Sequence, residues 1–190
     1  MEKKLIHLTI DESDDETRVE KVSFVDDPAI QRQWMAFNKQ GHRFKIESAD
    51  RRIVSGALMV ADMPIFRRAK DGSEYYVQFS ADSIKKIVYK FMREGRLSKV
   101  NQMHDTDVDG VFMFESFIVD ATRGIKTPDG HDELPDGSWF GSYKVDNDEL
   151  WAKVKDGSFQ GFSVEGMFDE GMEESVDERI VAALVKMLGG

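Results

Sequence analysis

Short runs of β-branched and aromatic residues, separated by turn-forming residues, recur along most of the chain, and this pattern constrains the fold more than any other feature. Such runs are typical of strands because branched and aromatic side chains pack well on a pleated surface. The runs lie at residues 4–9, 22–25, 43–47, 53–60, 74–79, 111–119, 139–145 and 162–164, with one further strand predicted to end at His104. The sequence therefore predicts a β-rich fold of the α+β class.

Helical periodicity is confined to a few segments. Ser80 is a predicted N-cap, and Ile84, Ile87 and Phe91 recur at helical spacing before Gly95 ends the helix. Asn147 is predicted to cap a second helix. A capping box at residues 175–178 predicts a C-terminal helix over about residues 176–188. The wide apolar face of that helix fits either the core or a contact in a homo-oligomer.

Composition narrows the class of protein. A chain of 190 residues without a linker-like segment predicts one domain over residues 1–190. The formal net charge of −10 predicts no nucleic-acid partner, because an acidic protein repels a phosphate backbone. No apolar run is long enough to predict a membrane span. The absence of cysteine excludes thiolate metal sites and cysteine nucleophiles, which leaves serine, threonine and carboxylate chemistry.

The segment 151–168 is predicted to run helix, turn and strand, with Ser163 in mid-strand. A hydroxyl on a rigid strand suits a nucleophile. Gly161 and Gly166 bracket the serine, and glycine within a strand often marks a bulge or a close approach of another backbone or a substrate. An ordinary serine on an edge strand would give the same pattern, so both interpretations stay open.

A serine nucleophile needs a base, and the four histidines are the candidates. His104 is favoured because it ends a predicted strand just before an acidic turn. Glu115 is a single carboxylate within an apolar strand, where alternation places it on the face of Val111 and Met113. We expect Glu115 to be partly buried and to orient the base, although an exposed carboxylate is the alternative.

The acidic turn at residues 105–110 also resembles the first half of a calcium-binding loop. The bidentate glutamate of such a loop belongs at its twelfth position, where this chain has Ser116, while Glu115 occupies the eleventh. The flanking segments are predicted strands rather than helices. We therefore interpret the segment as a polar hairpin turn and predict no metal ion and no cofactor.

Several fragments together resemble the tailed-phage prohead proteases, in particular their XkdF-like branch, which is related to the herpesvirus assembly proteases. These fragments are VSFVDDPAI (22–30), IVSGALMVADMPIFRR (53–68), QMH (102–104), FESFIVD (114–120) and GSWFGSYKVDNDELWAKVKDGSFQGFSVEG (137–166). The resemblance implies a small β-barrel or strongly curved sheet flanked by helices. It also implies catalysis by His104 and Ser163, with Glu115 as third member and Asp120 as the reserve candidate.

The resemblance further implies a serine endopeptidase that cleaves extensions of the scaffold or the major capsid protein. Its partners would be phage scaffold and capsid subunits, and it would act in the host cytoplasm inside the assembling procapsid. The alternative is a catalytically silent capsid-assembly or scaffold-binding protein of the same fold. The loop at residues 122–137, rich in proline and glycine with few apolar residues, is expected to be mobile and to act as a lid.

Overall fold

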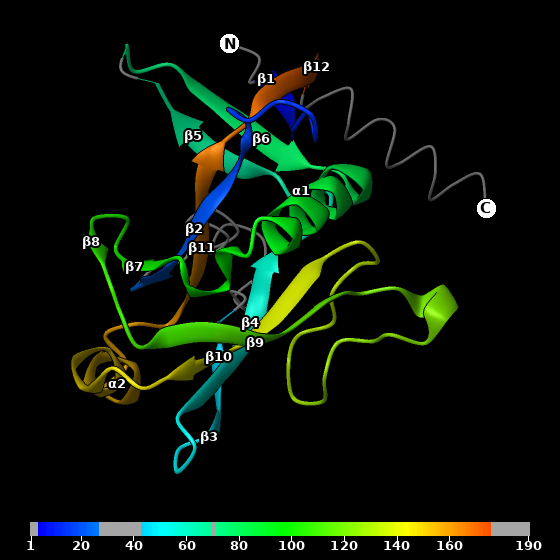
Figure 1. The fold of residues 1–190 in the computed structure, drawn as a ribbon. Helices are drawn as coiled ribbons and strands as arrows, with labels where there is room; N and C mark the ends of the chain where they lie inside the picture. The colour runs from blue at the N-terminus through cyan, green and yellow to red at the C-terminus, as the bar shows by residue number, and fades with distance from the viewer. Residues whose placement is uncertain (1–3, 27–42, 70, 176–190) are drawn as a thin grey trace.

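The computed structural model describes residues 4–26, 43–69 and 71–175, which form three four-stranded sheets and two α-helices (Figure 1). The first sheet has the order β12 (Asp169–Ser175), β1 (Lys4–Thr9), β6 (Glu74–Phe79) and β5 (Ile65–Arg68). The second has the order β3 (Lys45–Ser48), β4 (Ile53–Met59), β10 (Trp139–Val145) and β9 (Val111–Ile118). The third has the order β11 (Gly161–Met167), β2 (Arg18–Val25), β7 (Val100–Gln102) and β8 (Thr106–Asp107).

The prediction of a small β-barrel or strongly curved sheet flanked by helices is wrong, although the β-rich content is as expected. Within the described residues each sheet ends in two edge strands, and no strand pairing joins one sheet to the next. Closure of a barrel requires the last strand to pair with the first. Several edge strands are too short for this, since β8 has two residues and β3 and β5 have four each.

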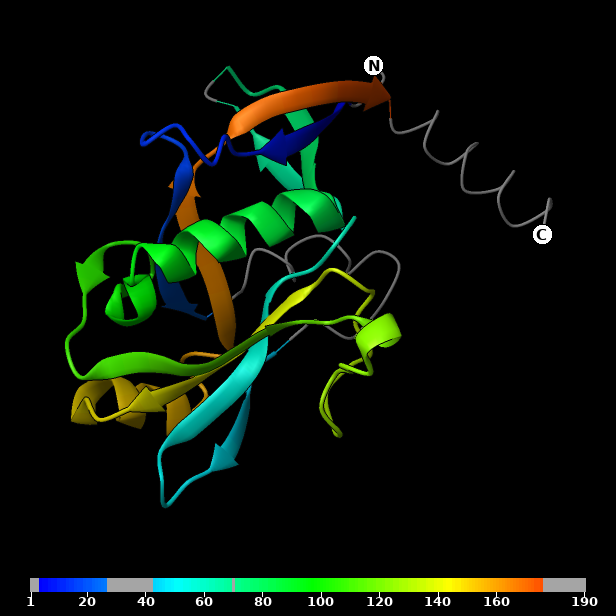
Figure 2. The same ribbon diagram turned by 45° about the vertical axis from the view of Figure 1, so that its right-hand side comes forward.

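Helix α1 (Ala81–Arg93) forms as predicted and lies across the molecule between the sheets (Figure 2). The Ser80 side chain accepts a hydrogen bond from the amide of Ser83 and so caps the helix. Ile84, Ile87 and Phe91 form its buried face, which packs toward β1, β2, β6 and β10. A short 3₁₀ turn, η2 (Arg96–Ser98), leads on to β7.

The second predicted helix is α2 (Asp148–Lys155), whose amide at Leu150 donates to the side chain of Asn147. No described helix is long and apolar enough to cross a membrane. The predicted C-terminal helix over residues 176–188 lies outside the described residues. So does the segment 31–40, for which the spacing of Trp34 and Phe37 suggests a loop or a short helix.

The loop between β9 and β10 begins with a 3₁₀ turn, η3 (Ala121–Arg123), and is packed more firmly than expected. Leu134 is buried against Val60, Val119 and Phe140 in a small apolar cluster. Its amide also donates to the Thr127 hydroxyl at 3.1 Å. Leu134 is thus an apolar anchor of this loop, whose expected mobility and role as a lid stay predictions.

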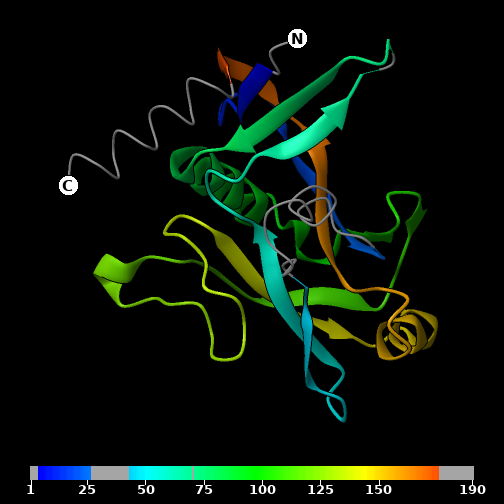
Figure 3. The ribbon, with the colours of Figure 1, turned by 180° about the vertical axis from the view of Figure 1, so that it is seen from behind.

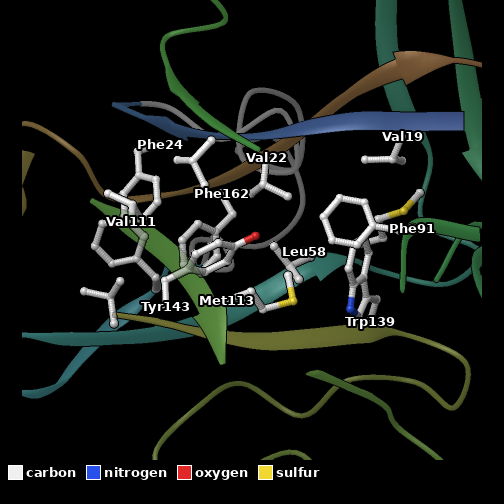
Figure 4. Packing of buried hydrophobic residues seen from close by; sticks show 14 of the residues in the cluster. Val19, Val22, Phe24, Leu58, Phe91, Val111, Met113, Trp139, Tyr143 and Phe162 are labelled. Atoms are coloured by element: carbon white, nitrogen blue, oxygen red, sulfur yellow. The ribbon is translucent and has the colours of Figure 1, made fainter. Parts of the chain in front are cut away.

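All three sheets contribute to the main apolar core, and Figure 4 labels residues of two of these sheets and of helix α1. Phe24 of β2 meets Phe162 of β11 edge to face, with ring centroids 5.1 Å apart, and meets Tyr143 of β10 at 5.7 Å. Phe91 of α1 packs on Trp139 of β10 at 5.1 Å. These aromatic contacts join the helix and two sheets, so that the strand bearing Ser163 is fixed by the core.

The hydroxyl of Tyr143 is the exception in this apolar core. Figure 4 shows its oxygen among apolar side chains, and within the described residues it has no hydrogen-bond partner. Burial raises the pKa of Tyr143 well above its ordinary value, because a phenolate would lose its hydration there.

We expect the Tyr143→Phe variant to be more stable than the wild type by about 1 kcal/mol, because it removes a buried polar group that makes no bond. Chemical denaturation that follows tryptophan fluorescence would measure the change. A loss of stability of similar size would mean that the hydroxyl has a bonding partner in solution.

Candidate active site

Ser163 lies in β11, which follows α2 as the sequence predicted. Its neighbour Phe162 points into the core, so alternation along the strand directs Ser163 to the opposite face. Ser163 is 7% exposed, and it pairs directly with Ser23 of β2. Seen from behind, β11 continues almost directly into β12, so that these two successive strands connect the third sheet to the first (Figure 3).

Gly166 marks a close approach of two backbones, as its place in the strand indicated. The pairing of β11 with β2 shifts by one residue between Glu165 and Gly166, which is a β-bulge. A Cβ atom on Gly166 would lie 2.1 Å from the carbonyl oxygen of Arg18. Only glycine fits there, and the bulge lies just beyond Ser163 and Glu165.

His104 lies in the tight turn between β7 and β8. Met103 and His104 both have left-handed backbone angles, with φ of 54° and 58°, and the amide of Asp105 donates to the carbonyl of Gln102 at 3.1 Å. A β-turn with positive φ at both central residues ordinarily selects asparagine and glycine there. Larger residues in this conformation are strained, and strain of this kind concentrates at functional sites.

A polar network surrounds the Nδ1 atom of His104. Ser23 Oγ lies 2.8 Å from Nδ1, and Glu165 Oε2 lies 3.4 Å from it. The same carboxylate oxygen accepts a hydrogen bond of 2.7 Å from Nδ2 of Asn101, whose Oδ1 accepts from the Ser23 hydroxyl. Because all these contacts are on the Nδ1 side, the Nε2 atom of the ring is left for another partner.

Ser163, His104 and Glu165 line one cavity of about 550 Å³. Most of its other walls are apolar, and among the described residues Arg67 of β5 is the only lysine or arginine that lines it. The apolar lining residues are Leu8, Leu58, Met59, Val60, Met63, Ile65, Phe79, Val164 and Phe168. The cavity thus places a hydroxyl, an imidazole and a carboxylate beside an apolar surface, which is the composition of a binding site for a chain with apolar side chains.

Glu115 lies apart from this group. It belongs to β9, in a different sheet, and it lines a separate pocket with Tyr89 and Phe114. The prediction that Glu115 is partly buried is wrong, because its side chain is exposed. The cause is a bulge: Met113 pairs with Tyr143 and Glu115 with Ser142, so Phe114 is an extra residue that breaks the alternation.

Asp120, the reserve candidate, caps the 3₁₀ turn η3. Its Oδ1 accepts hydrogen bonds from the hydroxyl of Thr122 at 2.6 Å and from the amides of Thr122 and Arg123. These bonds, above all that from the Thr122 hydroxyl, lower the pKa of Asp120. The carboxylate is therefore engaged in local structure.

Glu165 is the carboxylate that the structure brings to His104, and the sequence reasoning missed it. The signal was present, because Glu165 follows Ser163 by two residues in the same strand and alternation places both on one face.

The predicted hairpin turn over residues 105–110 is correct only in part, because the turn lies at residues 103–105 and joins β7 to β8 rather than to β9. Thr106 and Asp107 are strand β8, and Asp107 pairs with Lys21. In the described part of the chain no three histidine or acidic side chains are grouped as metal ligands.

Comparison with known proteins identifies the family of the chain. The sequence profile of the family described as "Putative phage serine protease XkdF" matches residues 42–173, which is more than half of the chain. The chain therefore belongs to this family, and the resemblance to phage prohead proteases is confirmed. No curated protein and no solved structure matches the chain significantly. The family name supports a protease role in general terms.

Proposed function

We propose that the protein is a serine endopeptidase in which Ser163 is the nucleophile, His104 the general base and Glu165 the carboxylate that orients the base. The observation that carries this proposal is the shared cavity, which Ser163, His104 and Glu165 all line. The contact between Glu165 and Nδ1 of the ring at 3.4 Å supports the third role, which we transfer from Glu115. Membership in a family of phage serine proteases agrees with it.

The chemistry follows from the two nitrogen atoms of His104. With Nδ1 engaged by Ser23 and Glu165, Nε2 carries the lone pair that can take the Ser163 proton. The Ser163 oxygen then attacks the peptide carbonyl carbon, and the imidazolium returns the proton to the leaving amine. Water hydrolyses the acyl-enzyme by the same route, and the negative charge of Glu165 stabilises the imidazolium in both steps.

Ser23 is a less suitable nucleophile, although its oxygen lies only 2.8 Å from Nδ1 of His104. Its side chain is 0% exposed, whereas Ser163 lines the cavity. Its hydroxyl donates to Asn101 and is therefore already engaged. A substrate carbonyl in the cavity would reach Ser163 rather than Ser23.

As the natural substrates we propose the scaffold protein, the major capsid protein, or both, cleaved inside the assembling procapsid. The test is to express the chain together with the scaffold and capsid proteins of the same phage and to map new termini by mass spectrometry. We expect new termini with the wild-type chain and none with the Ser163→Ala variant. If both chains leave the partners intact, a silent assembly protein becomes the better account.

We expect the cleavage sites to carry a bulky apolar residue next to the cleaved bond. The described residues that line the cavity beside Ser163 are mainly apolar, and burial of a leucine-sized side chain contributes about 1.5–3 kcal/mol to binding. Termini mapped in a peptide library would show enrichment of leucine, methionine or phenylalanine. Cleavage only at sites flanked by small or charged residues would contradict this assignment of the cavity.

A further inference from the structure

Two buried polar residues beside the proposed active site take no part in the bond-making and bond-breaking steps of the mechanism above. Ser23 of β2 and Asn101 of β7 are 0% and 2% exposed. Strand register places Ser163, Ser23 and Asn101 in one row across β11, β2 and β7. Buried polar side chains are stable only when they are bonded, so the bonds they make in this row determine which atoms carry protons.

The direction of each hydrogen bond follows from what each group can donate. A carboxylate only accepts, so the Asn101 atom that faces Glu165 must be the amide nitrogen, and Oδ1 faces Ser23. Oδ1 only accepts, so the single hydroxyl proton of Ser23 points at Asn101. The Ser23 oxygen can then only accept from His104, 2.8 Å away, and Nδ1 of His104 must carry the proton.

We propose that Ser23 and Asn101 are positioning residues that hold His104 in its Nδ1–H tautomer. The chain of donors runs from His104 through Ser23 and Asn101 to Glu165. In the opposite orientation the Ser23 hydroxyl would donate to His104, and the buried Oδ1 of Asn101 would lose its donor. The catalytic consequence rests on the proposed function: the Nε2 lone pair is kept free for the Ser163 proton.

The arrangement also suits the charged form of the ring. When His104 accepts the Ser163 proton at Nε2, Nδ1 still carries its own proton, so no hydrogen bond in the chain has to reverse. The network is therefore organised in advance for both forms. Glu165 supplies the charge, and Ser23 supplies the nearer acceptor, at 2.8 Å compared with 3.4 Å.

The test reads the tautomer directly by long-range ¹H–¹⁵N NMR on the full chain labelled at histidine, at a pH where His104 is neutral. A His104→Gln spectrum assigns the ring among the four histidines. We expect the Nδ1–H pattern in the wild type and a clear rise of the Nε2–H form in Ser23→Ala. Ser23→Thr, which keeps the hydroxyl, should restore the wild-type pattern.

A matched control is Ser55→Ala, which removes another buried serine hydroxyl, bonded to Ser142 at 2.8 Å in a different sheet. It should leave the His104 signals unchanged. Thermal unfolding checks that each variant is folded, and Ser23→Cys, of nearly the same shape, replaces Ser23→Ala if alanine prevents folding. An Nε2–H pattern in the wild type, or an unchanged spectrum in a folded Ser23 variant, would overturn the proposal.

Kinetics give the second measurement. Ser23→Ala should reduce kcat by on the order of 100-fold through a misplaced base, with KM nearly unchanged, and Ser23→Thr should recover most of the loss. The two proposals fail separately. If Ser163→Ala does not reduce cleavage, the protease assignment fails while the NMR spectra still decide the tautomer. If cleavage depends on Ser163 but the Ser23 spectra do not change, only the role of Ser23 and Asn101 is lost.

Discussion

Replacing Ser163 with alanine is expected to reduce the turnover of a processed substrate by on the order of a million-fold, and His104→Ala is expected to cost about the same. The double variant should be scarcely slower than either single variant. A nucleophile and its base act as a unit, so that removing one leaves nothing for the other to do. The measurement is the rate at which purified variants generate the termini mapped in the co-expression experiment.

Ser55→Ala is the control for this experiment, because it removes a buried serine hydroxyl in a different sheet from that of Ser163. It should process substrate at close to the wild-type rate. If Ser163→Ala processes normally, the chain is not a protease that uses this serine. Additive losses in the double variant would instead indicate that the two residues act independently.

Glu165→Gln is expected to reduce turnover by about a thousand- to ten-thousand-fold while the protein stays folded. Glutamine keeps the shape of the side chain but removes the charge that favours the imidazolium. Glu115→Gln is the matched control, an identical change at an exposed carboxylate in another sheet, and should have little effect. Single-turnover kinetics of both variants would decide between the two carboxylates.

The opposite result has a clear meaning. If Glu115→Gln abolishes processing while Glu165→Gln leaves it near normal, Glu115 is the third member, and the substrate complex must bring it to the ring. That rearrangement would have to join residues of two different sheets.

The parts of the site that could be predicted from sequence are those governed by local rules. Ser163 stood out because a capped helix and a turn precede its strand. His104 stood out because it follows a run of strand-forming residues and precedes acidic turn residues. Glu165 was within reach of the same rules, since the two-residue period of a strand links it to Ser163. The apolar surroundings of Glu115 in its predicted strand directed attention to that carboxylate instead.

Glu115 was misjudged because a single extra residue changes the face of everything after it. The bulge at Phe114 depends on the register with β10, and no local pattern in β9 reveals it. The prediction of a barrel was wrong for a related reason. Parallel pairs such as β1 with β6 and β2 with β7 join segments far apart in sequence, and the arrangement of the sheets follows from these non-local pairings.

The left-handed turn at Met103 and His104 has a consequence for how this protein would change under selection. A population screened only for solubility or heat resistance should drift toward asparagine and glycine at these two positions, because those residues relieve the backbone. Such descendants would keep the fold and lose the imidazole. If His104 is retained across generations, selection must act on activity, because selection for folding alone would replace it.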